Sequence, residues 1–404
     1  MLSAESRPYI DASVPVLREH GLAITTTFYR NLFAAHPELH NLFNAGNQAN
    51  GSQQQSLASA VFAYAANIDN QAALAPVVSR IVQKHASLGV TPDQYPIVGT
   101  HLLGAIKQVL GDAATPELLA AWGEAYGLLA QALIDEEKRA YRAAGVQPGA
   151  LSPMRVVAVN EESEQVKSFT LQPIDGTLPS FRAGQYVSVA VDLPGGLRQL
   201  RQYSLSDAPN GDHLRISVKR EAVDALDAAN AARPAGMVSN WLHDHLSVGS
   251  VVQVSKPFGD FLPDTESDAP IVLLSAGVGI TPMIAALNRI ADVAPQRRVV
   301  FAHAARHAGH HPHRADVAQA AARMPHLQSV VFYEEATGAA PGTFIPGRMR
   351  IEALPAWDFA DADVYLCGPL PFMQEQWAAL LAHGVPPARL HREVFGPDML
   401  DHLL

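Results

Sequence analysis

Cysteine is almost absent from this chain, since Cys367 is the only one among 404 residues. One thiol excludes an internal disulfide framework and a cluster of thiolate ligands, and it fits a reducing compartment. Long runs of lysine or arginine are also lacking, and the formal net charge is -10. That charge argues against nucleic acid or an anionic membrane surface as a partner. We therefore expect a cytoplasmic protein.

Uninterrupted apolar segments are scarce too. Residues 1–7 have no apolar core of the kind that a signal peptide needs. Residues 269–291 are largely apolar and long enough to cross a bilayer, but Gly277, Gly279 and Pro282 break them. We predict a strand, a loop and a helix there, and no membrane span.

What is present is a globular composition, 48% hydrophobic and 17% charged, at a length typical of two or three domains. Residues 1–146 have helical periodicity. The clearest helix begins at Thr115-Pro116-Glu117, which places a hydroxyl cap, a proline and an acid where helices begin. It is expected to end near Gly145. Residues 147–153, with two prolines and a glycine, are predicted to be a linker.

A change of period indicates two further domains. Over 154–264 apolar and polar residues alternate, which predicts an antiparallel β-barrel with an inserted loop or short helix at 222–235. Over 265–404 short apolar runs alternate with helical patterns, which predicts an α/β domain with a parallel sheet. The predicted strands of that sheet are 271–274, 299–302, 330–333 and 364–366.

Two polar motifs lie in the predicted barrel. Arg201-Gln202-Tyr203-Ser204 is on a strand, so Arg201 and Tyr203 face one side and Gln202 and Ser204 the other. A guanidinium suits phosphate, although an ordinary strand with a cross-strand ion pair is the alternative. Gly236-Met237-Val238-Ser239 opens an amphipathic run, and a helix beginning there would hold an anion or simply be capped.

Two glycine motifs lie in the predicted α/β domain. Gly277-Val278-Gly279-Ile280-Thr281-Pro282 joins a strand to a helix, with Thr281 as the expected cap and Pro282 as the first helical residue. It lacks the third glycine of the dinucleotide fingerprint, but its glycines would let a cofactor approach the backbone. A tight turn without a ligand is the alternative. Cys367-Gly368-Pro369 ends a later strand, where open parallel sheets bind ligands, although a lone cysteine there is more often buried packing.

Together these motifs, with Phe395-Gly396 near the C-terminus, resemble the ferredoxin–NADP reductase-like superfamily. The resemblance covers about 250 residues. It implies that the Arg201 strand binds the pyrophosphate and ring of a flavin, and that the glycine turn binds NAD(P)H.

The helical region carries a candidate electron acceptor. His85 lies on an apolar helix face, where a satisfied core residue is the ordinary interpretation, and His101 is placed similarly. Tyr29 and Gln53 beside Phe43 and Leu57 would form an apolar pocket with two hydrogen-bond donors, which suits oxygen on haem iron.

A carboxylate is expected behind a histidine ligand, because the second ring nitrogen needs an acceptor. Glu136 and Glu137 flank the apolar stripe of the last helix about equally, and periodicity does not choose between them. A solvated charge cluster at 135–139 is the alternative.

Residues 1–146 resemble a globin, and the whole chain resembles a flavohaemoglobin. The resemblance implies haem b, FAD and either NADH or NADPH as cofactors, in an all-α globin, an antiparallel FAD-binding barrel and an α/β NAD(P)-binding domain. It implies His85 as the proximal ligand, Tyr29 and Gln53 as distal groups, Leu57 as the residue that crowds the iron, and Tyr95 and Glu137 as partners of His85. It assigns Lys84 and Glu393 to coupling of the two modules, Tyr186, Arg201, Gln202, Tyr203, Ser204, Val394, Phe395, Gly396 and Pro397 to the flavin, and the Gly277 turn to the nucleotide.

Two departures from that family are visible. The linker lacks the usual tryptophan-containing glycine segment, and 222–235 is longer than usual. Both bear on the relative placement of the domains rather than on the chemistry.

The implied activity is that of a nitric oxide dioxygenase, in which electrons pass from NAD(P)H to FAD and then haem, and O2 oxidises NO to nitrate. The alternatives are a reductase of alkyl hydroperoxides, free flavin or ferric species, and an oxygen sensor or store. O2 and NO are the expected partners, with a lipid in the haem pocket left open and no obligate protein partner evident.

A histidine-rich segment remains outside this interpretation. With Gly309 and Pro312 inside it, we favour a solvated loop over a metal site, and Arg306 could meet a 2′-phosphate without deciding between NADH and NADPH. Its histidines are His303, His307, His310, His311 and His313.

Overall fold

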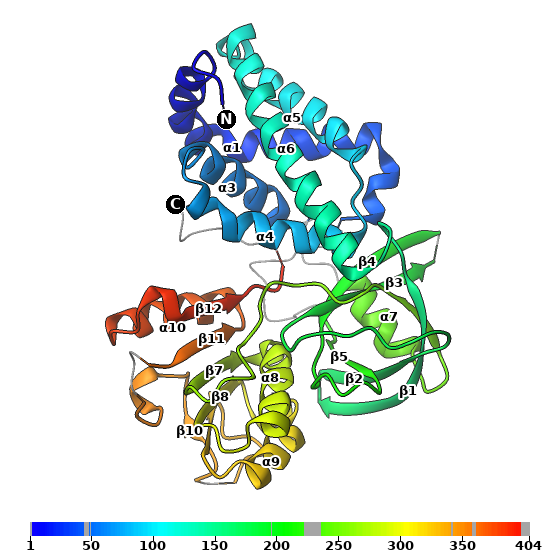
Figure 1. Ribbon diagram of the computed structural model, residues 1–404, viewed down its shortest axis with the longest axis vertical. Helices are drawn as coiled ribbons and strands as arrows, with labels where there is room; N and C mark the ends of the chain where they lie inside the picture. The colour runs from blue at the N-terminus through cyan, green and yellow to red at the C-terminus, as the bar shows by residue number, and fades with distance from the viewer. Residues whose placement is uncertain are drawn as a thin grey trace.

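The computed structural model describes residues 2–43, 48, 50–194, 196–221, 236–340, 342–357 and 361–396. Figure 1 shows a helical domain above two sheet-containing domains that lie side by side. The segment 222–235 and Pro397, for which we made predictions, lie outside the described residues.

The first domain is helical, as predicted. Phe28, Leu32 and Ile106 are almost fully buried at its centre, and Trp122 donates to the Ser13 hydroxyl at 3.2 Å. Its elements are α1 (Arg7–Ala35), η1 (Pro37–Asn41), α3 (Ser52–Ala66), α4 (Gln71–Leu88), α5 (Gln94–Leu110), η2 (Gly111–Ala113) and α6 (Pro116–Ala144).

The ends of α6 are where the sequence predicts them. The Thr115 side chain accepts a hydrogen bond from the Leu118 N–H at 3.2 Å, and Pro116 occupies the first helical position. Gly145 ends the helix with a φ of 65°, a left-handed conformation that glycine adopts without a steric penalty.

The second domain is an antiparallel barrel with strand order β4-β3-β6-β1-β2-β5. The two end strands of this order meet through a bridge between Leu205, which directly follows β4, and Ile216, which lies on β5. Strand β1 begins inside the predicted linker, because Ser152 already pairs with Val254. The elements are β1 (Ser152–Ser163), β2 (Val166–Pro173), β3 (Tyr186–Leu193), β4 (Leu197–Ser204), β5 (Leu214–Lys219), α7 (Met237–His245) and β6 (Val251–Val254).

The third domain is a parallel sheet of order β10-β9-β8-β7-β11-β12. Its first strand lies inside the sheet, so the strand order reverses at β7, where open α/β sheets bind ligands. Helices α8 and α9 pack on one face and α10 on the other (Figure 1). The strands are β7 (Ile271–Ala276), β8 (Val299–Ala305), β9 (Leu327–Tyr333), β10 (Ile345–Pro346), β11 (Asp363–Cys367) and β12 (Leu390–Glu393). The helices are η3 (Gly277–Gly279), α8 (Ile280–Val293), η4 (Ala308–His310), α9 (Arg314–Arg323), η5 (Ile351–Ala353), α10 (Leu370–Ala382) and η6 (Pro387–Arg389).

The apolar segment 269–291 forms β7, η3 and α8, as expected. Among the described residues, no helix combines the length and the apolarity needed to cross a membrane. The segment instead lies in the core shared by the sheet, α8 and the barrel residues Ala183 and Phe261.

Candidate functional site

His85 is held by a buried carboxylate. Its Nδ1 lies 2.7 Å from Glu137 Oε1 and 3.1 Å from the Tyr95 hydroxyl, which donates to the same carboxylate oxygen. An ionised carboxylate only accepts, so Nδ1 carries the ring proton and the lone pair is on Nε2. Within the described residues Nε2 makes no hydrogen bond, and the side chain is 32% exposed although Glu137 is 3% exposed. The ring therefore presents a fixed, unprotonated nitrogen of the kind that binds iron.

The choice between the two glutamates follows from packing. Glu137 is buried beside His85, whereas Glu136 is partly exposed and pairs with Arg139 on the surface of α6. The charge-cluster alternative therefore applies to Glu136 and not to Glu137. His101 lies on α5, and its ring contacts the His36 ring edge-on with the two centroids 5.4 Å apart. Among the described residues it has no such carboxylate partner.

Tyr29 lies on α1 in an aromatic cluster. Its ring centroid is 5.8 Å from that of Phe33 and 5.6 Å from that of Phe43. Burial raises the pKa of Tyr29 to about 12, and a hydrogen bond with Gln53 offsets part of that rise. The hydroxyl therefore stays protonated at neutral pH and can donate. Leu57 lies one helical turn after Gln53 and packs against the same core.

The apolar residues around this cluster fit a flat hydrophobic group. Phe43, Leu57, Val61 and Val98 pack against the core but are only partly buried, as is Ile81 on α4. Apolar side chains that remain partly exposed inside a helical domain leave surface that a haem would cover. The donor set and the apolar surface thus fit the group that the sequence implied.

Arg201 is a partly buried cation with no anionic partner among the described residues. Its guanidinium donates to the Leu200 carbonyl at 2.7 Å and to Gln199 Oε1 at 2.9 Å. Burial lowers its pKa, and in the described part of the chain no carboxylate pairs with it. Within the described residues Arg201 therefore does not form the cross-strand ion pair that we considered, and on the same strand Arg198 pairs with Asp192 instead. A guanidinium in this position fits a diphosphate group.

The strand pairing aligns the other predicted flavin residues. Ser204 lies opposite Tyr186, and Tyr203 lies opposite Val187 with its ring against the barrel core. Burial raises the pKa of both tyrosines, so both hydroxyls remain protonated. Gln202 on β4 and Tyr186 on β3 both face the helical domain, where they bond Ser87.

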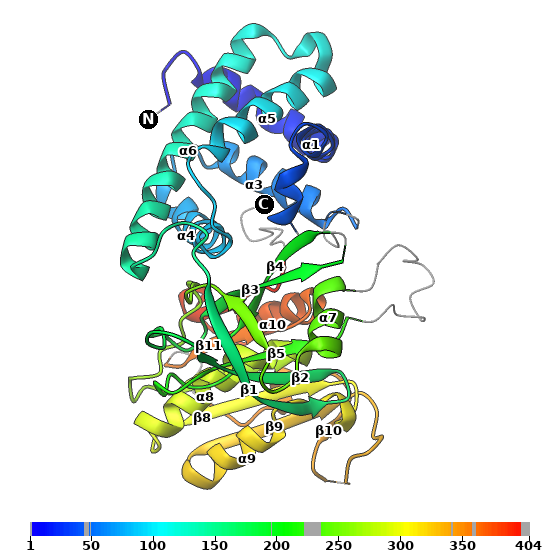
Figure 2. The same ribbon diagram turned by 90° about the vertical axis from the view of Figure 1, so that its right-hand side faces the viewer.

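One turn of α4 connects the domains. Gln202 Nε2 donates to the Ser87 hydroxyl at 3.3 Å, and the Gly259 N–H donates to Gln83 Oε1 at 3.0 Å. Lys84 Nζ lies 3.5 Å from the Gly396 carbonyl of the C-terminal segment. Figure 2 shows α4 at the lower end of the helical domain, where it faces the barrel, in agreement with these contacts. The helix that carries His85 is therefore also the helix that docks on the barrel.

Glu393 ends β12 at this junction. Burial raises its pKa to about 8, the Asp260 charge adds to the rise, and Arg80 and Lys84 oppose it. The folded protein thus holds a proton on Glu393 that the unfolded chain releases at lower pH.

Stability should therefore fall with pH at this residue. The contribution of the protonated Glu393 is complete below about pH 4.5, declines as pH rises, and is gone above about pH 8. Glu393→Gln cannot ionise, so its Tm should exceed the wild-type Tm by a margin that widens from acid to alkaline pH. Thermal melts over this range test the prediction, with the exposed Glu335→Gln as the control. Parallel Tm curves for Glu393→Gln and wild type would contradict it.

The glycine turn follows β7, as predicted, but the helix begins earlier than expected. Gly279 is the N-cap, and Thr281 donates from its hydroxyl to the Val278 carbonyl at 3.0 Å instead of capping. Pro282 is the third helical residue. The prediction of the cap was wrong because the η3 turn starts the helix two residues sooner. Pro282 is still tolerated, since the first N–H groups of a helix have no partner within it.

Gly279 is required by a close approach of two strand ends. A Cβ built there would lie 2.3 Å from the Cys367 carbonyl oxygen, so the turns after β7 and β11 meet without a side chain between them. Gly277 has a φ of 55°, which favours glycine. Both turns are at the carboxyl edge of the sheet, beside the strand where the order reverses.

Four other predicted contacts have different surroundings. Ser239 donates to the Gly236 carbonyl at 3.1 Å within its own turn, and Cys367 is fully buried, which raises its thiol pKa. Phe395 is 45% exposed, and Val394 is partly buried. Their roles toward a cofactor stay predictions.

The histidine-rich segment is not a solvated loop, and that prediction was wrong. His303, His311 and His313 are buried because distant strands supply polar partners. Ser275 bonds His303 at 2.9 Å, Tyr333 bonds His311 at 2.7 Å, and Ser217 bonds His313 at 2.9 Å.

The sequence also missed an ionic network between the barrel and the α/β domain. Arg215 donates to Asp316 at 2.6 Å, and His313 lies 3.0 Å from the same carboxylate. Asn288 links Asp316 to Asp207. The spacing of His313 and Asp316 at the start of α9 was the available local signal.

Comparisons with known proteins agree with this architecture. Residues 26–133 match the model of the globin family, and residues 273–377 match that of the oxidoreductase NAD-binding domain. A flavohemoprotein of Chromobacterium violaceum is 49% identical over 405 residues, covering 98% of both chains.

Solved structures agree as well. The flavohemoglobin of Malassezia yamatoensis, solved with bound FAD and heme, has a TM-score of 0.85 at 31% identity, covering 98% of this chain and 100% of that one. The FAD/NAD-binding domain of a nitric oxide dioxygenase from Vibrio cholerae has a TM-score of 0.55 at 38% identity, covering 61% of this chain and 99% of that one.

Proposed function

Because this chain belongs to the flavohemoprotein family, we propose that it is an NAD(P)H-dependent nitric oxide dioxygenase that converts NO and O2 to nitrate. It uses haem, held by His85, and FAD, held by Arg201, Tyr203 and Ser204. When bound, these two groups supply the redox chemistry that carries electrons from NAD(P)H to oxygen.

The observation that carries the proposal is the fixed imidazole of His85. The 2.7 Å contact with Glu137 makes the ring a stronger electron donor through Nε2, which favours oxygen activation over reversible storage. On the other side, the protonated Tyr29 donates toward the ligand pocket, and Gln53 orients that hydroxyl.

The reductase residues bind and align. Arg201 neutralises the diphosphate of FAD, and Tyr186 and Gln202, which both bond Ser87, hold the flavin strands against α4. NAD(P)H occupies the carboxyl edge of the parallel sheet, where Gly277 and Gly279 leave the backbone open. Helix α4, which carries His85, would link the two cofactor sites because it also bonds the barrel.

The reaction balances with one outside electron for each nitrate. Oxidation of NO to nitrate releases three electrons, whereas O2 takes up four. Since NAD(P)H supplies two electrons, each NAD(P)H supports two nitrates. A store would need no such supply, and a peroxidase would consume NAD(P)H without O2.

The test is nitrate production by the purified holoprotein. With NADH, O2 and NO present, nitrate should accumulate in that ratio, and omission of O2 should stop NO consumption. NADH oxidation that NO does not accelerate would instead indicate an oxygen store. NADH oxidation driven by an alkyl hydroperoxide, without nitrate formation, would indicate the reductase alternative.

Glu137→Gln should slow NO consumption by about ten- to a hundredfold, because the amide is a poorer acceptor for the His85 proton. The iron–histidine stretching frequency of the ferrous protein should fall with it. Glu136→Gln is the matched control, since this neighbouring carboxylate lies on the surface. Unchanged turnover and stretching frequency in Glu137→Gln would mean that the carboxylate only fills space.

A further inference from the structure

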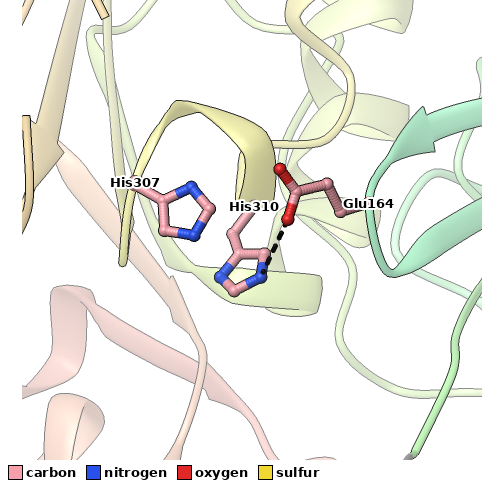
Figure 3. Close-up of side chains that lie close together, drawn as sticks. All are labelled: Glu164, His307 and His310. Atoms are coloured by element: carbon pink, nitrogen blue, oxygen red, sulfur yellow. Dashed lines mark ion pairs between the residues drawn. The ribbon is translucent and has the colours of Figure 1, made fainter. Parts of the chain in front are cut away.

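Glu164, His307 and His310 come together from two domains. Glu164 lies in the turn between β1 and β2 of the barrel, and both histidines lie in the segment after β8 of the α/β domain. Each residue offers one nitrogen or oxygen atom within 4.8 Å of the others. Figure 3 shows the carboxylate pointing at His310, with His307 on the far side of that ring.

Glu164 and His310 form a long ion pair, and the distance between them also matches that between two ligands of one metal ion. His310 Nε2 lies 3.6 Å from Glu164 Oε2, which is too long for a hydrogen bond. Two tetrahedral ligands about 2.1 Å from zinc are separated by about 3.4 Å. We propose that Glu164, His307 and His310 form a binding site for a divalent transition-metal ion such as Zn²⁺, which joins the barrel to the α/β domain.

The backbone builds this arrangement. The Glu164 N–H donates to the Gly309 carbonyl at 2.9 Å, which docks the β1–β2 turn on η4. A Cβ on Gly309 would lie 2.0 Å from Glu164 Oε1 and 3.1 Å from the His307 ring. The absence of a side chain at 309 therefore allows the carboxylate to lie beside both imidazoles.

The ligands are chemically ready for a cation. His310 is 16% exposed, so its ring is partly shielded from solvent within the cluster. Glu164 is 62% exposed, which gives an ion access from solvent. A set of two imidazoles and one carboxylate is typical of zinc sites that keep a fourth position for water.

Two features limit the affinity. The Gly309 N–H donates to His307 Nδ1 at 3.2 Å. Coordination through Nδ1 would replace this hydrogen bond, and coordination through Nε2 would leave the ring proton on Nδ1, so the bond is lost in either case. Arg306 and Lys219 act on His310 as positive charges. The site should consequently weaken below neutral pH, where protons compete for the imidazoles.

A second cluster with similar residues is closed to a metal. Glu162, His313 and Asp316 also lie close together, but His313 bonds Ser217 and Asp316 through its two nitrogens. Arg215 occupies the Asp316 carboxylate. An ion there would have to displace a guanidinium, whereas at Glu164 it displaces a long ion pair and the hydrogen bond between Gly309 and His307.

The test is zinc binding to the full-length holoprotein without a polyhistidine tag. Equilibrium dialysis against Zn²⁺ at neutral pH, with zinc measured by mass spectrometry, should find one more ion per chain in wild type than in His310→Ala. Glu164→Gln should raise the zinc Kd at least tenfold. His326→Ala removes an exposed imidazole from the same domain and is the matched control, expected to bind as wild type does.

Gly309→Ala provides a variant that removes no ligand. The added methyl displaces the Glu164 carboxylate, so zinc affinity should fall although all three ligands remain. Haem and flavin absorption confirm that each variant is folded. Zinc should also raise the Tm of wild type and of His326→Ala, and not that of Gly309→Ala. Equal zinc uptake by all variants, or no uptake by wild type, would overturn the proposal.

Discussion

His85→Ala should lower NO consumption more than about a hundredfold, because it removes the iron ligand itself and not merely a residue that hydrogen-bonds to that ligand. The haem Soret band should weaken or shift, because the imidazole that Tyr95 and Glu137 hold in place would be missing. Electron transfer from NADH to ferricyanide should persist, since the flavin site lies in another domain.

His101→Ala is the matched control. It removes an imidazole from the same helical domain that is packed against His36 and not against a buried carboxylate. We expect its absorption spectrum and turnover to match those of wild type. Full NO consumption by His85→Ala, or equal losses in both variants, would show that the haem is held elsewhere.

Arg201→Met should lower the affinity for FAD by about ten- to a hundredfold for each charge-assisted hydrogen bond that it removes. In the flavin-free protein, by contrast, the same substitution should not lower the free energy of unfolding. Arg201 is partly buried and has no carboxylate partner in the described part of the chain, so methionine relieves the cost of desolvating its charge. The apoprotein should be at least as stable as wild type.

Two measurements check this pair of expectations. Flavin titration of apoprotein gives the affinity, and urea unfolding of the same preparations gives the free energy of unfolding. Arg198→Met is the matched control, because this exposed arginine lies on the same strand opposite Asp192. Wild-type FAD affinity in Arg201→Met, or a clearly destabilised apoprotein, would mean that the guanidinium serves the fold instead.

The architecture could be predicted because its signals are local. The cap at Thr115 and the left-handed glycine at 145 set the ends of α6, and alternation of apolar residues located β3 and β5. A local signal gave the wrong helix start where a turn just before it had already begun the helix. Thr281 and Pro282 look like the start of a helix, but η3 had already placed the backbone.

Side-chain partners across the fold were harder to predict. Glu136 and Glu137 are equivalent by periodicity, and only the rotation of α6 against α4 buries Glu137 beside His85. The buried histidines were misread for a similar reason. Glycine and proline around His311 suggested a solvent-exposed loop. The residues that bond the buried histidines, Ser275 for His303 and Tyr333 for His311, lie on other strands, and no local sequence pattern links them to the histidines.

The last turn of α4 has a consequence for how such a chain can change over evolution. Gln83 and Ser87 bond the barrel, and His85 lies between them on the same turn. A substitution that shifts this turn to suit a new reductase surface also moves the imidazole. The helical domain and the reductase domains therefore cannot be exchanged independently between proteins. A chimera needs an α4 surface that matches the β3–β4 surface of its barrel.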